Sequence, residues 1–145
     1  MIALIQRVND ASVQINQQTI ARINYGLLAL IGIEKHDNDA TLHKLAHKLL
    51  NYRLFSDSQG KMNLNIQQIN GEILLVSQFT LAANTQKGNR PSFDCAMAPQ
   101  QAAQYFQQFC QHIRQQHPAT QTGEFGANMQ INLTNDGPVT FWLQT

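Results

Sequence analysis

The chain has 145 residues, 43% of them hydrophobic, and a formal net charge of +1 at pH 7. This length fits one domain, residues 1–145, with room for a hydrophobic core, and the composition excludes disordered and fibrous classes. Affinity for a long nucleic acid comes largely from neutralised phosphates, so the near-neutral charge argues against DNA as a partner. Any contact with RNA should involve one end of the molecule.

Targeting and redox signals are absent from the sequence. No apolar run approaches the roughly 20 residues of a membrane-spanning helix, and the N-terminal apolar segment is too short for a signal peptide. Cys95 and Cys110 form no CxxC motif, so neither a disulfide framework nor a thiolate zinc site is expected. The prediction is a cytoplasmic protein with no cofactor and no membrane partner.

The first third of the chain predicts strands and then a helix. Strand patterns, either apolar throughout or alternating, occur at 1–8, 11–15, 19–23 and 27–33. The last of these is a continuous apolar run, typical of a strand buried on both faces. From Asn38 the apolar residues recur at helical spacing, so a helix should run to about Arg53 with Asn38 or Asp39 as its N-cap.

The rest of the chain repeats this alternation. A strand is expected at 72–81, and Pro99 should open a second amphipathic helix that ends near Pro118. Two further strands, 129–133 and 139–143, should be joined by a turn. This order predicts a mixed α/β fold of three layers, in which one layer of two helices covers two packed β-sheets.

A pair of histidines on the first predicted helix has the spacing of a possible metal site. His43 and His47 lie four residues apart, but they fall on the polar side of the helix and no third ligand follows at a suitable distance. A solvated helix face is therefore favoured, and no metal site is predicted.

Two hydroxyl groups follow the apolar run of the strand at 72–81. Ser77 or Thr80 could be a nucleophile, but a hydroxyl needs an activating base, and the sequence has no triad-type motif or Gly-x-Ser-x-Gly elbow. Residue types alone favour hydroxyls that satisfy backbone groups at the end of a strand.

Two further segments each allow a structural and a functional interpretation. Gly137-Pro138 is either the tip of a hairpin or a cis peptide where bare backbone approaches a ligand. Phe125 and Met129 are either core residues or the walls of a shallow site for a stacked base. The residues alone leave both questions open.

Two motifs carry a resemblance to a known family. They are Ser77-Gln78-Phe79-Thr80 and Asn135-Asp136-Gly137-Pro138-Val139. Both resemble the signature motifs of the D-aminoacyl-tRNA deacylases, and shorter segments at 6–8, 11–13, 60–63 and 90–93 also match in order. The resemblance covers nearly the whole chain.

The resemblance implies an enzyme that hydrolyses the ester between a D-amino acid and the 3′-terminal adenosine of tRNA. It also implies a homodimer whose active site lies at the subunit interface. A cis Gly137-Pro138 would reach into the partner's pocket and select the hand of the amino acid. Ser77, Gln78, Phe79 and Thr80 would be the catalytic segment, with Gln78 as a positioning residue, and Phe125 and Met129 would lie beside the adenine.

Handedness is best sensed through atoms that all substrates share, namely the amino group, Cα and its hydrogen. Backbone carbonyls of a rigid turn suit this task, and such a filter should not exclude glycyl-tRNA.

Backbone N–H groups near Phe79 and Thr80 are candidate oxyanion donors. The water could be activated by the substrate's ribose 2′-hydroxyl, while Thr80 as an acyl-enzyme nucleophile is the competing mechanism. A non-catalytic module that binds a tRNA end or a nucleotide is the alternative function.

Overall fold

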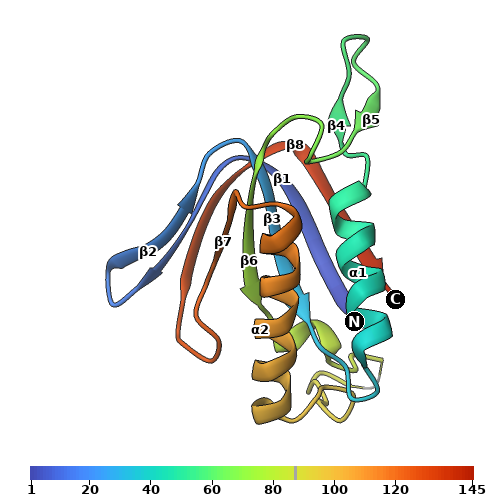
Figure 1. The fold of residues 1–145 in the computed structure, drawn as a ribbon. Coiled ribbons are helices and arrows are strands. Elements are labelled where there is room, and N and C mark those ends of the chain that lie inside the picture. Colours follow the sequence, from blue (N-terminus) through green and yellow to red (C-terminus); the bar gives the residue numbers. More distant parts are fainter. Residues whose placement is uncertain (87) are drawn as a thin grey trace.

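The computed structural model describes residues 1–86 and 88–145 of the chain (Figure 1). In this part of the chain the strands are β1 (Ile2–Ile15), β2 (Gln18–Ile23), β3 (Gly26–Gly32), β4 (Phe55–Ser56), β5 (Met62–Leu64), β6 (Glu72–Ser77), β7 (Thr120–Thr122) and β8 (Gln130–Gln144). The helices are α1 (Asp39–Asn51), α2 (Pro99–Gln116) and the short 3-10 helix η1 (Phe79–Ala82). The mixed α/β class and the two α-helices are confirmed.

Hydrogen bonds join most of the strands into one six-stranded sheet. Its order is β2-β1-β3-β6-β7, with β8 paired to β1, and β4 and β5 form a separate two-stranded sheet. The pairs β3–β6 and β6–β7 are parallel, whereas β1 is antiparallel to β2, β3 and β8. Both helices lie on the same side of this sheet (Figure 1). The structure has one six-stranded sheet and one two-stranded hairpin, so the expected packing of two sheets in three layers is not shown.

Strand β3 is buried on both faces, as its apolar run predicts. Leu27, Ala29 and Ile31 belong to the core cluster that also contains the apolar faces of α1 and α2. The intervening Leu28 belongs to a second cluster, where it meets residues of β1, β2 and β6 such as Val13. Because side chains alternate across a strand, these two clusters lie on opposite faces of the sheet.

Helix α1 begins at a capping box. The Asn38 side chain accepts hydrogen bonds from the amides of Ala40 and Thr41, and the Thr41 hydroxyl accepts one from the Asn38 amide. Such a cap stabilises a helix by about 0.5–2 kcal/mol, which explains why the helix starts where the sequence predicts. It ends at Asn51, slightly before the expected Arg53, because Tyr52 is already extended.

Three expected boundaries are wrong. The segments 1–8 and 11–15 are one strand, β1, and the strand expected at 72–81 ends at Ser77, where the chain turns into η1. The segments 129–133 and 139–143 are also one strand, β8, because both pair with β1. Residues 135–139 therefore form an irregularity within a strand and not the turn of a hairpin.

No helix among the described residues is long and apolar enough to cross a membrane.

Candidate active site

A hollow of about 480 Å³ opens at the carboxyl end of β6. Ser77, Gln78 and Phe79 line one side, the first turns of α2 line another, and the segment 125–131 completes it. This volume is within the range of small-molecule sites. None of the described residues that line the hollow is ionisable. The first signature motif therefore faces a largely apolar space that offers no side-chain acid or base.

Two backbone amides at the rim of the hollow are free to donate. The amide of Gln78 donates to the Ile31 carbonyl (2.7 Å), and that of Leu81 donates to the Gln78 carbonyl (3.2 Å). Between them, the N–H groups of Phe79 and Thr80 have no acceptor among the described residues, as is general for the first residues of a helix. These are the two amides that the sequence singled out as oxyanion donors.

Thr80 lies beside the hollow without lining it. Its hydroxyl accepts a short hydrogen bond, 2.5 Å, from the Nε2 of Gln78, and its side chain is exposed. The only described hydrogen-bond partner of the Thr80 hydroxyl is thus an amide, which cannot act as a base. The geometry connects Gln78 to Thr80 and provides no activated nucleophile.

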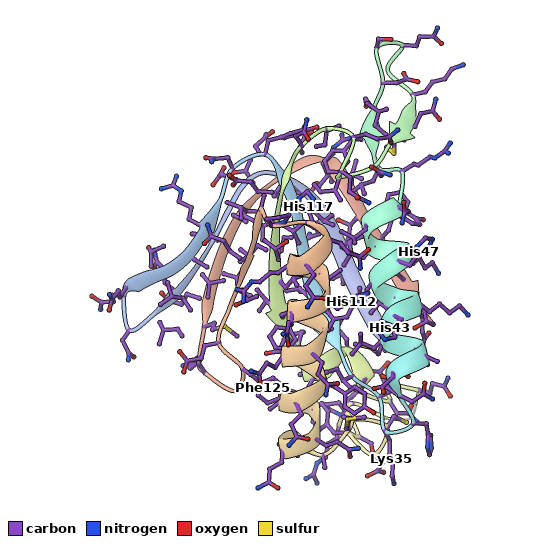
Figure 2. The ribbon with its side chains drawn as sticks, in the orientation of Figure 1. Lys35, His43, His47, His112, His117 and Phe125 are labelled. Carbon is purple, nitrogen blue, oxygen red and sulfur yellow. The ribbon has the colours of Figure 1, made fainter. Side chains whose placement is uncertain are left out.

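Phe125 and Met129 line the same hollow as Ser77 and Phe79. Each is half-buried and also packs on the core, Phe125 on the helix-side cluster and Met129 on the opposite one. The Phe125 ring lies 6.1 Å from that of Phe106 on α2, centroid to centroid, and Figure 2 shows it beside the first half of that helix. The core and site interpretations of these residues are therefore compatible.

The second signature motif is a bulge in β8, held by two side chains. Register along β1 jumps from Gln6 opposite Thr140 to Val8 opposite Asn135, so residues 136–139 loop out beside Arg7. The Asn135 side chain closes the loop, because its Oδ1 accepts from the Val139 amide (2.7 Å) and its Nδ2 donates to the Val139 carbonyl (3.3 Å). Arg7 anchors it from β1 through Asp136.

Within one chain, this bulge is remote from the first signature motif. The peptide between Gly137 and Pro138 is cis, and both residues are exposed. Asn135 pairs with Val8, which pairs with Gly26, whereas Ser77 pairs with Ile31. The five residues from Gly26 to Ile31 correspond to about 17 Å along the strands. One copy of the chain therefore does not bring its two signature motifs together.

The histidines are not part of the hollow. His47 contacts Asn51 on its own helix, and the buried His117 contacts the Gly71 carbonyl at 2.7 Å. His43 does not pair with His47; it meets His112 of α2 instead. Sequence spacing could not reveal this pair, because its members are 69 residues apart.

Comparison with known families gives a match over nearly the whole chain. A family model described as D-Tyr-tRNA(Tyr) deacylase matches residues 4–144. The chain belongs to the D-Tyr-tRNA(Tyr) deacylase family. This confirms the resemblance drawn from the two motifs, and it makes the chain a member of a family of hydrolases that act on ester bonds.

Relatives of this deacylase family align over almost their full length. The chain is 63% identical over 143 residues to the D-aminoacyl-tRNA deacylase of Dichelobacter nodosus, covering 99% of each chain. It is 58% identical over 144 residues to that of Shewanella frigidimarina, again covering 99% of each.

Solved structures agree on the fold. One described as c-Myc DNA Unwinding Element Binding Protein superposes with a TM-score of 0.96 at 38% identity, covering 100% of this chain and 99% of that one. A structure described as a probable eukaryotic D-amino acid tRNA deacylase superposes with a TM-score of 0.89 at 16% identity, covering 99% and 98%, and shows the fold alone.

Proposed function

We propose that the protein hydrolyses the ester bond of D-aminoacyl-tRNA, releasing the D-amino acid and free tRNA in the cytoplasm. Membership of the family supports the reaction class. The single observation that supports the location of the site is the hollow at the end of β6, where the first signature motif and two free amides meet.

Ester hydrolysis needs a placed water and donors for the negative charge that develops on the carbonyl oxygen. The N–H groups of Phe79 and Thr80 are the donors in this proposal, and one such donor is typically worth about 2.7–4 kcal/mol of transition-state stabilisation. Because no described side chain that lines the hollow is ionisable, the ribose 2′-hydroxyl of the substrate is the group that activates the water in this proposal. Gln78 is the positioning residue for the bound ester, and Phe125 and Met129 flank the terminal adenine.

Handedness is read by a second copy of the chain. The enzyme must accept many side chains of one hand, so it has to contact the amino group and Cα. Backbone carbonyls of Gly137-Pro138 from the partner would hold the amino group and leave space for only a hydrogen where an L-residue carries its side chain. A thousandfold preference requires about 4 kcal/mol, which one steric clash can supply.

A homodimer follows from this scheme. Gly137 and Pro138 are exposed and remote from Ser77 of their own chain, so in this scheme another copy delivers them to the first motif. Three large apolar side chains on η1 and β8 are also exposed: Phe79, Leu133 and Trp142.

Since glycine has no hand, the steric filter also admits glycyl-tRNA, and hydrolysis of that ester at high enzyme concentration is expected.

The deciding experiment compares the two hands of one substrate. Purified protein should release tyrosine from D-tyrosyl-tRNA and leave L-tyrosyl-tRNA intact. Among the described residues the hollow has no ionisable side chain, which favours one other candidate, a non-catalytic module that binds the tRNA end. Binding of both esters with release from neither would establish that candidate and overturn the enzyme.

A further inference from the structure

One histidine from each α-helix meets on the outer side of the helical layer. The Nδ1 of His43 on α1 lies 3.4 Å from the Nε2 of His112 on α2, with ring centroids 4.5 Å apart and planes inclined by 67°. Figure 2 shows both rings in the space between the helices. His43 is exposed and His112 is half-buried, so the pair is open to solvent on one side.

We propose that His43 and His112 form a binding site for a divalent transition-metal ion of the zinc type, which bridges α1 and α2. Imidazole nitrogens bind such ions, and Zn–N bonds are about 2.0–2.1 Å long. Two nitrogens on one tetrahedral ion are then about 3.4 Å apart, from the same bond lengths. The observed separation matches this value, so the two nitrogens need neither approach nor separate to share one ion.

The surroundings of the pair include two groups that favour a cation and one that competes for a ligand atom. Burial, and next the neighbouring His43, lower the pKa of His112, which favours the uncharged imidazole. Asp39, one turn before His43 on α1, lines the same hollow and adds a negative charge. The Nε2 of Gln116 donates a hydrogen bond to the Nε2 of His112 at 2.8 Å, so this exposed side chain has to rotate away before His112 binds an ion.

The site has two protein ligands. Among the described residues, no three His, Cys, Asp or Glu side chains are grouped closely enough to hold an ion. Water would complete the coordination, so the ion should exchange readily. His47 provides a matched control, because it is a neighbouring exposed histidine on α1 that contacts Asn51 and not His112.

The test is calorimetric titration of ZnCl₂ into tag-free protein. Wild-type protein should bind one zinc ion per chain, and His43→Ala and His112→Ala should each weaken binding at least tenfold, since even an outer-shell change typically costs about 10–100-fold. His47→Ala should bind as wild type does. Zinc should also raise the melting temperature of wild type and His47→Ala but not of the other two variants, because only binding to the folded state stabilises it.

Three results would overturn the proposal. If zinc does not bind at millimolar concentration, the pair is only a ring–ring hydrogen bond. Equal loss in His47→Ala would place the ion on the His43–His47 face of α1. Unchanged affinity in His112→Ala, or in His112→Asn if the alanine variant does not fold by circular dichroism, would remove α2 from the site. None of these readouts involves tRNA, so they are independent of the proposed function.

Discussion

Arg7 and Asp136 link the second signature motif to the strand beside it. The Nε of Arg7 lies 2.9 Å from both the carbonyl oxygen and the carboxylate of Asp136, and its Nη1 donates to the Leu54 carbonyl at 2.9 Å. Arg7 is only 8% exposed. This buried guanidinium therefore holds the β8 bulge against β1 and against the segment that follows α1.

Replacement of this guanidinium should destabilise the fold. In Arg7→Lys, an ammonium cannot reproduce the planar fork, and an unpaired buried carbonyl costs about 1–3 kcal/mol. We expect the free energy of unfolding in urea to fall by about that amount. Asp136→Asn is the control: it keeps the backbone acceptor and an amide oxygen beside the Arg7 guanidinium, so it should cost less than Arg7→Lys. Equal effects of the two substitutions would contradict this assignment.

A mixed dimer can show whether the site combines two chains. Gly137 has φ +149°, and a Cβ there would lie 2.6 Å from the Val139 amide nitrogen, so Gly137→Ala should distort the bulge and abolish activity. In a heterodimer of Gly137→Ala and Gln78→Ala chains, one of the two sites keeps both native motifs if they come from different subunits. Activity should then reappear on co-expression of the two inactive variants.

The control for this experiment is Gly60→Ala. Gly60 also has positive φ, +77°, but nothing lies within 4 Å of an added Cβ, and it lies outside the candidate site. This variant should fold and turn over D-tyrosyl-tRNA as wild type does. A co-expressed pair that stays inactive, while each variant dimerises, would mean that each site is built within one chain.

The periodicity and composition of the sequence were sufficient to predict the two α-helices and β3. Leu42, Leu45 and Leu49 repeat at helical spacing because α1 buries one face, and the unbroken run of β3 reflects its two buried faces. These patterns depend on local geometry, which each segment carries in its own sequence.

The candidate site depends instead on partners distant in the chain. Asn-Asp-Gly-Pro has the composition of a turn, and only the pairing of both flanks with β1, together with the Asn135 side chain, makes it a bulge. Likewise, nothing local predicts that His43 meets His112. Phe125 and Met129 line the same hollow as Ser77, a neighbourhood that the sequence did not indicate, and their role beside the adenine stays a prediction.

Thr80→Ala separates the two chemical mechanisms. The Thr80 hydroxyl has an amide as its described partner and no base, so we expect near-normal kcat on D-tyrosyl-tRNA and no acyl-enzyme by mass spectrometry of quenched wild-type reactions. Thr80→Ser is the control, because it would preserve a nucleophile. Loss of activity in the alanine variant only, with a trapped acyl adduct on wild type, would establish the nucleophilic mechanism.

The two cysteines should differ sharply in reactivity. Burial raises the pKa of the Cys110 thiol to about 12, against a smaller lowering by Arg114, whereas Cys95 is exposed. At pH 8 nearly all Cys110 is therefore the thiol and not the thiolate, which is the reactive form. A thiol reagent should label one cysteine per native chain and two in denaturant. Native Cys95→Ser should remain unlabelled; labelling of that variant would show that Cys110 is accessible.

A backbone ester can test the oxyanion donors directly. Replacing Phe79 with its hydroxy-acid analogue, phenyllactic acid, removes one N–H and keeps the side chain. Because that amide has no described acceptor in the resting protein, stability should change little while kcat falls about 10²–10³-fold. The same replacement at Leu81, whose N–H is bonded to the Gln78 carbonyl, should lower stability by about 1 kcal/mol and leave kcat within a few-fold of wild type. Equal kcat for both esters would exclude the Phe79 amide from the chemistry and leave Thr80 as the sole donor to examine.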